Sequence, residues 1–587
     1  MPAATCQSFV RCCSMLISLV ALWSAPAAVL AQTNISAGAS ALFPESTIVY
    51  VEANQAGQLL DKLVDHPLRG RIEALAPVQQ FLRGPEMFAT QMFVGILEAQ
   101  LEMTWREALR AMTAHGLAMG VDGQSQGVLL VTRAVDGPTL SKIVRTILGW
   151  VELQARNENR ATPFQMIDYR GHRIARFPEF ALGRVDDWFF VSNQAALLQA
   201  AMDRALDGAT DGLTSSAVWQ HSAKMRDATS DVWVVADLDS LRRAGLAREL
   251  LSGTTDNAGA ELLLGGVFEA LGQAAVVAAN INVKDDGVRL AISMPHELHR
   301  ISPARSYFFA DNQQPRAARI AHVPGAIGQV YAHRDLRGWW QSKEDLFDEN
   351  VIAQLLQTDS QLSILFAGLD FGNDILGALE PDLQIIVAPQ EYDATHPPEL
   401  KLPAFALVGQ LRQPDEIKRR LRIAYQSVIG FVNIQLAMEG YPQLDLVTEA
   451  RDGMEISAAT YVLDARSQRG LVHYNFSPTL AFQGDLLILS STRSLAEQIA
   501  SAQDSTTPDT KTNFWLHLEG PALSDVLRLN RQLLVVQNMI EQGTDKPTAE
   551  GNVELMLNAL SWVQTFDSRL NVNADELIWV TEVQFVK

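Results

Sequence analysis

Strand-like and helix-like segments follow one another in the same order twice along the chain. The first stretch runs from about residue 43 to 295, and the second from about residue 323 to 586. Alternating apolar positions indicate half-buried strands, and apolar positions three and four apart indicate helices. A repeat of this length predicts two copies of one domain rather than a solenoid of short units.

The first stretch shows the order of elements, with turn residues marking the boundaries. We expect a strand at 47–52, a helix at 57–64, a helix-rich region at 68–112, a hairpin over 117–134, a helix opened by Pro138, short strands over 164–190, a helix at 194–206, a strand at 231–237 and a closing hairpin over 274–294. In the second stretch, a strand at 404–411 precedes a helix opened by Pro414, and the turn residue Gly453 matches Gly171.

Four pairs of segments can be aligned residue by residue. Residues 43–51 match 323–331, residues 187–192 match 485–490, residues 231–237 match 513–519, and a hairpin starts at both Asn282 and Asn571. The alignment places Trp233 opposite Trp515, and a duplication predicts equivalent places for them in two superposable units. A polar residue that both copies need should also appear in both, and almost none does.

The predicted fold class is α+β. Hairpins dominate the expected strand pairing, so each copy should be a mainly antiparallel sheet with helices packed on one face. The predicted organisation is a signal peptide at 1–31, a mobile leader at 32–41, copy one at 42–299, a linker at 300–320 and copy two at 321–587.

The first 31 residues have the pattern of a secretory signal. Arg11 supplies the positive charge, residues 12–23 form the apolar segment, and Ala31 offers a small residue before Gln32. An uncleaved anchor is the alternative, but the apolar segment is shorter than the roughly 20 residues of a membrane span. Cleavage is therefore favoured, and it predicts an exported chain. The absence of cysteine after the signal favours the periplasm or envelope of a bacterium over an animal secreted protein.

Composition narrows the classes of function. Hydrophobic residues make up 48% of the chain and charged residues 19%, which indicates globular domains with sizeable cores. All three cysteines (Cys6, Cys12 and Cys13) lie in the signal, so the mature chain has no cysteine nucleophile, thiolate metal site or disulfide. The net charge of −20 disfavours nucleic acid and anionic lipid surfaces as partners.

No later segment predicts a membrane span. The nearest, residues 262–283, contains Glu269 and the Gly265-Gly266 pair, so a buried helix followed by a strand is the better interpretation.

Two motifs suggest metal binding and each has a simpler explanation. His296 and His299 flank Glu297, but metalloproteases need histidines four residues apart, and a solvated helical turn is favoured. Asp237 and Asp239 follow a strand, as in nucleotide-sugar enzymes. Their counterparts in copy two are Glu519 and Pro521, so helix initiation explains both copies better.

The other candidates also favour structural roles. The pairs Asp186-Asp187 and Asp285-Asp286 fall in predicted hairpin turns, where aspartate is common. His115, His172 and His517 have no histidine counterpart in the other copy, so only a site unique to one copy could use them. Trp339-Trp340 could anchor a partner, but core packing of at least one ring is favoured. The chain has no nucleophile elbow, phosphate loop or dinucleotide-binding fingerprint.

Two sequence segments resemble a known family: Phe-Pro-Glu-Ser-Thr-Ile-Val-Tyr-Val at 43–51 and Asp-Asp-Trp-Phe-Phe-Val-Ser-Asn at 186–193. They resemble exported bacterial proteins that are grouped only as domains of unknown function. The resemblance covers most of the mature chain and implies no catalytic residue.

Three hypotheses of function follow. The first is a non-catalytic exported envelope or periplasmic protein, a scaffold or binding module whose partner is an unknown protein or a small apolar ligand. The second is an extracytoplasmic hydrolase with a site in one copy or between copies. The third is a carrier of an apolar ligand. No catalytic, cofactor-binding or metal-binding residue is assigned, and no cofactor, nucleic acid or transmembrane segment after signal cleavage is expected.

Overall fold

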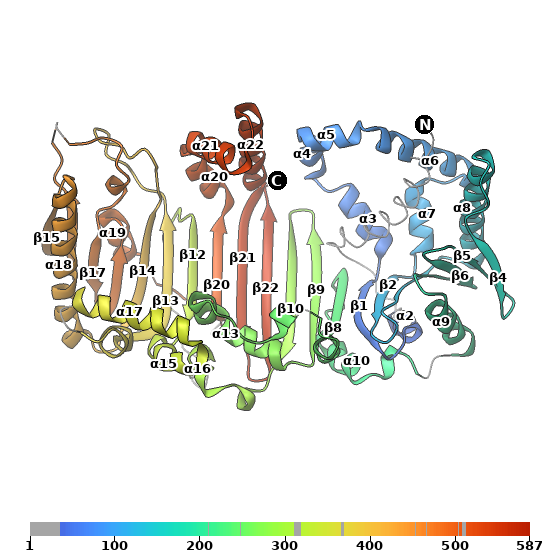
Figure 1. Ribbon diagram of the computed structural model, residues 1–587, viewed down its shortest axis with the longest axis horizontal. Helices are drawn as coiled ribbons and strands as arrows, with labels where there is room; N and C mark the ends of the chain where they lie inside the picture. Colours follow the sequence, from blue (N-terminus) through green and yellow to red (C-terminus); the bar gives the residue numbers. More distant parts are fainter. Residues whose placement is uncertain are drawn as a thin grey trace. The chain divides into compact units, whose positions relative to one another are not determined.

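The chain forms two compact units. Figure 1 labels their helices and strands. The computed structural model describes residues 36–586, apart from residues 209–210, 247, 310–318, 366–368, 452, 465–466, 503 and 507–511. Unit 1 holds the chain up to Arg248 together with Ala274–Pro295, and unit 2 holds Glu249–Gln273 and His296–Val586. The predicted signal peptide and residues 32–35 of the predicted leader lie outside the described residues.

Unit 1 contains an antiparallel sheet with the strand order β10-β9-β8-β1-β2-β3-β7-β6-β5-β4. The strands are β1 (Thr47–Ala53), β2 (Leu117–Asp122), β3 (Val128–Arg133), β4 (Gln165–Tyr169), β5 (His172–Arg176), β6 (Ala181–Val185), β7 (Trp188–Ser192), β8 (Val232–Asp237), β9 (Val276–Lys284) and β10 (Gly287–Pro295).

Unit 2 contains an antiparallel sheet with the strand order β22-β21-β20-β12-β13-β14-β18-β17-β16-β15. Its strands are β12 (Gly328–His333), β13 (Leu379–Ala388), β14 (Ala404–Leu411), β15 (Leu444–Arg451), β16 (Met454–Tyr461), β17 (Thr479–Gln483), β18 (Leu486–Ser490), β20 (Thr512–Glu519), β21 (Val563–Val572) and β22 (Glu576–Phe585). The short strands β11 (Arg319–Ala321) and β19 (Asp504–Thr506) pair with each other.

The helices of unit 1 precede β1 or follow β1, β3, β7 and β8 in the chain. They are α2 (Ser36–Ala39), η1 (Ser40–Leu42), α3 (Ala56–Val64), α4 (Arg69–Glu73), α5 (Ala76–Leu82), α6 (Pro85–Leu101), α7 (Trp105–Met112), α8 (Gly137–Asn157), α9 (Ala195–Asp207), η2 (Leu213–Ser215), α10 (Ala217–Ser222), η3 (Ala223–Met225) and α11 (Leu238–Arg243).

The helices of unit 2 come from two parts of the chain, the segment between β8 and β9 and the segment after β10. They are α12 (Arg248–Leu251), α13 (Ala258–Gln273), η4 (Leu298–Arg300), η5 (Pro303–Arg305), α14 (Ser306–Phe309), α15 (Leu336–Gln341), α16 (Lys343–Leu346), α17 (Glu349–Leu365), η6 (Phe371–Ile375), η7 (Leu376–Ala378), α18 (Pro414–Glu439), η8 (Val472–Asn475), α19 (Arg493–Ser501), α20 (Gly520–Leu529), α21 (Arg531–Gln542) and α22 (Lys546–Trp562).

The two units share one strand order, and this confirms the prediction of an α+β fold built on mainly antiparallel sheets. Each strand of unit 1 has a counterpart at the same place in the order of unit 2: β1 corresponds to β12, β7 to β18 and β8 to β20. Trp233 and Trp515 thus lie on corresponding strands. Descent of both units from one duplicated domain would produce this order and stays a prediction.

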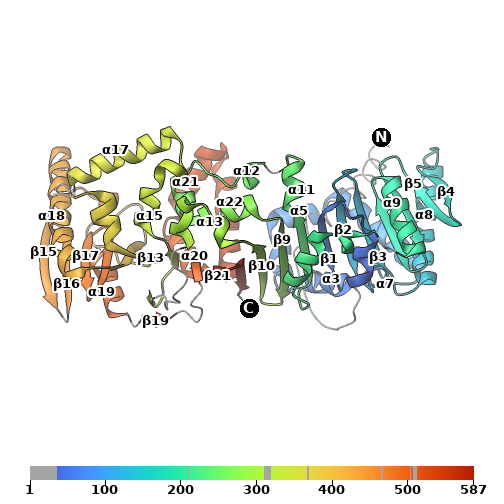
Figure 2. The same cartoon turned by 90° about the horizontal axis from the view of Figure 1, so that it is seen from below.

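Helices pack on both faces of the sheets, so the prediction of one covered face was wrong. In unit 1, Phe189 packs with Leu140 of α8, whereas the next residue, Phe190, packs with Leu198 of α9. Figure 2 shows the ribbon of these helices from below. In unit 2, Leu480 packs with Ile417 of α18, and the adjacent Ala481 faces α19. Adjacent apolar residues on one strand point to opposite faces, and so each face needs its own cover.

Three predicted segments differ from the structure. Residues 36–41, expected in a mobile leader, form α2 and part of η1, and Ala39 and Leu42 are buried in the core of unit 1. Residues 249–273, expected in copy one, belong to unit 2. The predicted linker at 300–320 contributes η5 and α14, whose Tyr307 and Phe308 are buried.

Helix starts and turns follow the sequence signals. Asp237 accepts a hydrogen bond from the Ser240 N–H and caps α11, and Glu519 precedes α20, which has proline in its first turn. This confirms helix initiation at both positions. Gly171 and Gly453 both adopt positive φ angles (80° and 77°) in their hairpin turns, a conformation that glycine allows without strain.

Replacement of Asp231 with asparagine should stabilise unit 1 at pH 8. The Asp231 carboxylate accepts a hydrogen bond of 2.9 Å from the Val283 N–H, and burial raises the pKa of this carboxyl to about 6. A folded-state pKa above the unfolded value of about 3.9 means that stability is lost as the pH rises through 6. Asparagine, which the alignment places at the equivalent position as Asn513, keeps an acceptor without the charge. We expect a gain on the order of 1–3 kcal/mol at pH 8 and little change below pH 4.

Urea unfolding of the Asp231→Asn variant at several pH values measures this gain. Asp227→Asn is the matched control, because hydrogen bonds from Thr229 lower the pKa of Asp227 and the variant should therefore lose stability at pH 8. A less stable Asp231→Asn protein at pH 8 would contradict the argument.

Candidate functional site

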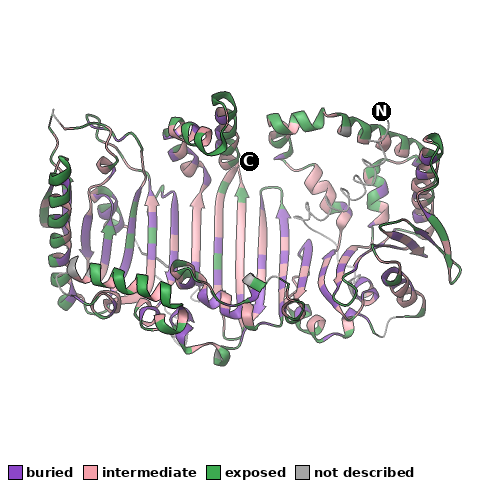
Figure 3. Ribbon diagram, viewed as in Figure 1, coloured by how far each residue is buried: buried purple, intermediate pink, exposed green. Residues whose placement is uncertain are grey.

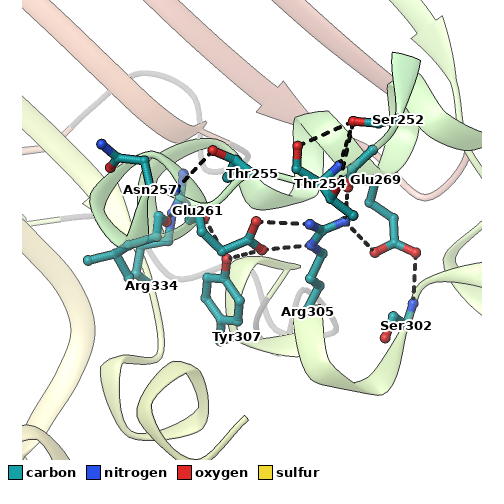
Figure 4. Close-up of polar contacts among 12 residues, drawn as sticks. Ser252, Thr254, Thr255, Asn257, Glu261, Glu269, Ser302, Arg305, Tyr307 and Arg334 are labelled. Carbon is teal, nitrogen blue, oxygen red and sulfur yellow. Dashed lines mark hydrogen bonds and ion pairs between the residues drawn. The ribbon is translucent and has the colours of Figure 1, made fainter. Parts of the chain in front are cut away.

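A buried network of charged side chains lies in the second unit (Figure 4). Glu261 and Glu269 lie on α13, and Arg305 ends η5. The Arg305 guanidinium donates two parallel hydrogen bonds to Glu261, at 2.7 and 2.8 Å, and a third of 3.2 Å to Glu269. Two parallel bonds are the strongest geometry for this ion pair. Glu261 is 0% exposed, so the pair is sealed from solvent.

Glycines on α13 make room for the aromatic residues of α14. Tyr307 donates a hydrogen bond of 2.6 Å to the Glu261 carbonyl oxygen. A Cβ atom on Gly265 would overlap the Tyr307 hydroxyl, and one on Gly266 would overlap the Phe308 ring. The Gly265-Gly266 pair therefore allows close packing that larger residues would block.

Arg334 extends this network towards the sheet of unit 2. Its side chain is 1% exposed and lies 3.9 Å from the centre of the Phe308 ring. It donates to the Leu263 carbonyl at 2.6 Å and to the Asn513 Oδ1 at 2.7 Å. Burial lowers the pKa of the guanidinium to about 9. The cation thus holds α13 against β20 through uncharged acceptors, and the role this supports is structural.

Neither of two open hollows on unit 2 reaches the network. Their lining residues are Asn433, Ile434, Ala437, Met438 and Gln443 in one, and Ala394, Thr395, Pro397, Pro398, Glu399, Lys401, Arg469 and Gly470 in the other. A substrate in either hollow would meet no histidine and no member of the buried network.

Two histidine–carboxylate pairs lie on strands of the second sheet. His333 contacts Asp382 through Nδ1 at 2.7 Å, and the Tyr331 hydroxyl donates to the same carboxylate at 2.6 Å. His517 lies between Asp567 and Glu519, and its hydrogen bond to Asp567 is the largest cause of its raised pKa.

Sequence reasoning missed both pairs. His333 pairs directly with Asp382 across β12 and β13, and His517 with Asp567 across β20 and β21. Opposite charges at facing positions stabilise a sheet. Strand register is the signal that brings these residues together, and it cannot be read from one segment alone.

The two histidines of the His296–His299 motif lie in different surroundings. His296 is buried and stacks on Phe309, with ring centres 5.6 Å apart, and burial lowers its pKa. His299 is exposed and lies 3.3 Å from Glu297. Within the described ranges, no group of three histidine, cysteine or acidic residues is placed to hold a metal ion.

The remaining sequence candidates have structural roles. Asp239 forms an ion pair with Arg242 on α11. Asp186 adopts a positive φ of 49° in the turn before β7, and Asp285 and Asp286 form the turn between β9 and β10.

The tryptophan pair packs inside unit 2. Trp339 and Trp340 are both buried, which confirms the expectation of core packing.

A largely apolar surface, with no charged residue among its described exposed positions, covers the outer side of α6. The exposed side chains or glycines among the described residues of this 17-residue helix are Pro85, Phe88, Ala89, Gln91, Met92, Gly95, Ile96, Ala99 and Gln100. We name this set the α6 face; Figure 3 shows exposed residues along α5 and α6 in green. Phe88 is 67% exposed and Met92 58%. A helix that faces water normally carries charges on its outer side, so this face is unusual.

Unit 2 has a comparable surface on α18. Its C-terminal half has no charged residue between Arg422 and Glu439, and it exposes Ile423, Phe431, Ile434 and Met438. Each unit therefore presents one helix with an uncharged, partly apolar outer side.

None of the helices in the described part of the chain is long and apolar enough to cross a membrane.

Comparisons with known proteins give little further information. No family model and no curated protein matches the chain. Among solved structures, crystal forms I and IV of TP0453 are similar to 49% and 50% of this chain, and the matches cover 88% and 92% of those chains. Both are 10% identical with a TM-score of 0.25, and at that score the likeness carries no inference.

Proposed function

We propose that this chain is a non-catalytic binding module exported to the envelope of a bacterium. The observation that carries the proposal is the α6 face, because a soluble unit rarely leaves large apolar side chains exposed along one helix without a partner. The signal-like pattern of residues 1–31 supports export.

The polar clusters support a non-catalytic role. Catalysis needs acid, base or nucleophilic groups that converge where a substrate can reach them. The network around Arg305 is sealed, and the pairs at His333 and His517 are cross-strand contacts within a sheet. The arrangement supplies rigid sheets that hold helices in place, which suits a binding surface.

Isolation of the native protein from its own envelope fraction tests this function. We expect an intact mass that begins at Gln32, and a bound component that is lost from the Phe88→Glu/Met92→Glu double variant. The matched control is Leu153→Glu, because Leu153 is half exposed on α8 of the same unit and lies off the α6 face. A cytoplasmic protein that keeps residues 1–31, or equal binding by all variants, would refute the proposal.

A further inference from the structure

We propose that the α6 face rests on the uncharged interfacial layer of a lipid bilayer, with the helix lying along the surface. The inference rests on the proposed function, and it names the chemistry of the partner. An interfacial helix buries its apolar side at the boundary between headgroups and acyl chains while its other side stays attached to the protein.

The position of α6 in unit 1 fits this arrangement. Phe93 contacts Trp150 of α8, with ring centres 4.2 Å apart, so the inner side of α6 is held by the protein. Phe88, Met92 and Ile96 are four residues apart and therefore form one row on the outer side. The row carries side chains of the kinds that partition into acyl chains.

The charges around α6 favour a neutral surface. Arg106 pairs with Asp65 at 3.0 Å, and Arg110 donates to Asp61 at 2.7 Å, so these two cations of α7 are balanced by acids, and Arg83 is an exposed cation just before α6. The whole chain carries a net charge of −20, and an anionic surface would repel it. Electrostatic attraction therefore supplies little binding energy, and the remaining driving force is burial of apolar area in a neutral layer.

Trp105 lies next to the C-terminal end of α6, because its backbone N–H donates a hydrogen bond of 2.9 Å to the Glu98 side chain. It opens α7, is 40% exposed, and lies under the Arg106 guanidinium at 5.7 Å. Tryptophan and arginine are common where protein meets the bilayer headgroups. α8 provides the contrast, since its exposed residues include Arg145 and Arg156, as expected for a helix that faces water.

A single fluorescent label measures contact with lipid directly. Cys6, Cys12 and Cys13 all lie in the signal, so the mature chain from Gln32 has no cysteine and can take one label at Met92→Cys or Leu153→Cys. The label is an environment-sensitive nitrobenzoxadiazole group, and the probe is vesicles of palmitoyl-oleoyl phosphatidylcholine. We expect a blue shift and higher intensity for the label at position 92, and no change at position 153.

The outcomes separate the possible partners. A shift at position 92 that raised salt leaves intact supports a neutral lipid interface. No shift with any vesicle, or a shift only with vesicles that contain phosphatidylglycerol and only at low salt, overturns the inference. A shift that grows with protein concentration without vesicles indicates a second copy of the chain and also overturns it.

A partition measurement with unlabelled protein completes the test. The Phe88→Glu/Met92→Glu variant should bind phosphatidylcholine vesicles at least roughly ten-fold more weakly in a flotation assay, equivalent to about 1.4 kcal/mol. Leu153→Glu should bind normally, and circular dichroism confirms that each variant is folded. If lipid binding is absent but a protein partner from the envelope depends on the α6 face, the inference fails and the proposed function stands.

Discussion

Replacement of Arg305 with methionine is expected to lower the free energy of unfolding of unit 2 by about 3–5 kcal/mol. The variant leaves two carboxylates, Glu261 and Glu269, buried without their cation. Removal of one partner of a buried ion pair is costly because the charge that remains has lost both water and its counter-ion. Methionine fills much of the volume, so the loss reports charge and hydrogen bonding more than packing.

Urea unfolding followed by hydrogen exchange measures the loss and assigns it to unit 2. The control is Arg493→Met on α19, where an exposed arginine donates to Glu497 at 2.8 Å and should contribute less than about 1 kcal/mol. The triple variant Arg305→Met/Glu261→Gln/Glu269→Gln should recover most of the loss, since it removes the unpaired charges. Equal stability of Arg305→Met and the wild type would show that the network is not a structural requirement.

Replacement of Trp233 with alanine should cost unit 1 about 3–5 kcal/mol. The Trp233 ring is 1% exposed. It packs edge-on against Trp219 at 5.1 Å and Tyr50 at 6.2 Å, and the Arg226 guanidinium lies 4.9 Å from its centre. Alanine would leave a cavity that three neighbouring elements border and cannot close without moving β8.

Trp515→Ala is the matched variant on the corresponding strand of unit 2. Trp515 is only partly buried and packs against Tyr331, so its removal should cost less, about 1–2 kcal/mol. Thermal and urea unfolding of both variants give the comparison. Equal losses would contradict the argument that burial decides the cost, and so would a larger loss at Trp515.

Local features of the fold were predictable where short-range chemistry decides them. Pro138 and Pro414 mark the first turns of α8 and α18, and Asp237 caps α11, because a helix start depends on a few neighbouring residues. The buried helix and strand over residues 262–283 also followed from their apolar run. The adjacent apolar residues Phe189 and Phe190 indicate that both faces of the sheet are covered. The prediction of one covered face overlooked this signal.

The candidate site depended on contacts between distant residues. Arg305 is 44 residues from Glu261 along the chain. His517 contacts Asp567, which is 50 residues away along the chain. Arg305 stood in a predicted polar linker, where nothing local distinguishes a buried arginine from a solvated one. The sequence predicted only a helix-rich region at 68–112, and which apolar residues of α6 stay exposed follows from the structure.

The sequence by itself determined most of the helices and strands and the recurrence of their order, but not the helices at 36–42 and 303–309. Periodicity, turn residues and helix caps act over a few residues, so one chain segment contains them whole. The tertiary structure alone decided that residues 249–273 join unit 2, that Glu261 finds Arg305, and that the outer side of α6 stays uncovered. Burial and charge pairing depend on which distant surfaces meet, and that is a property of the folded chain rather than of any segment.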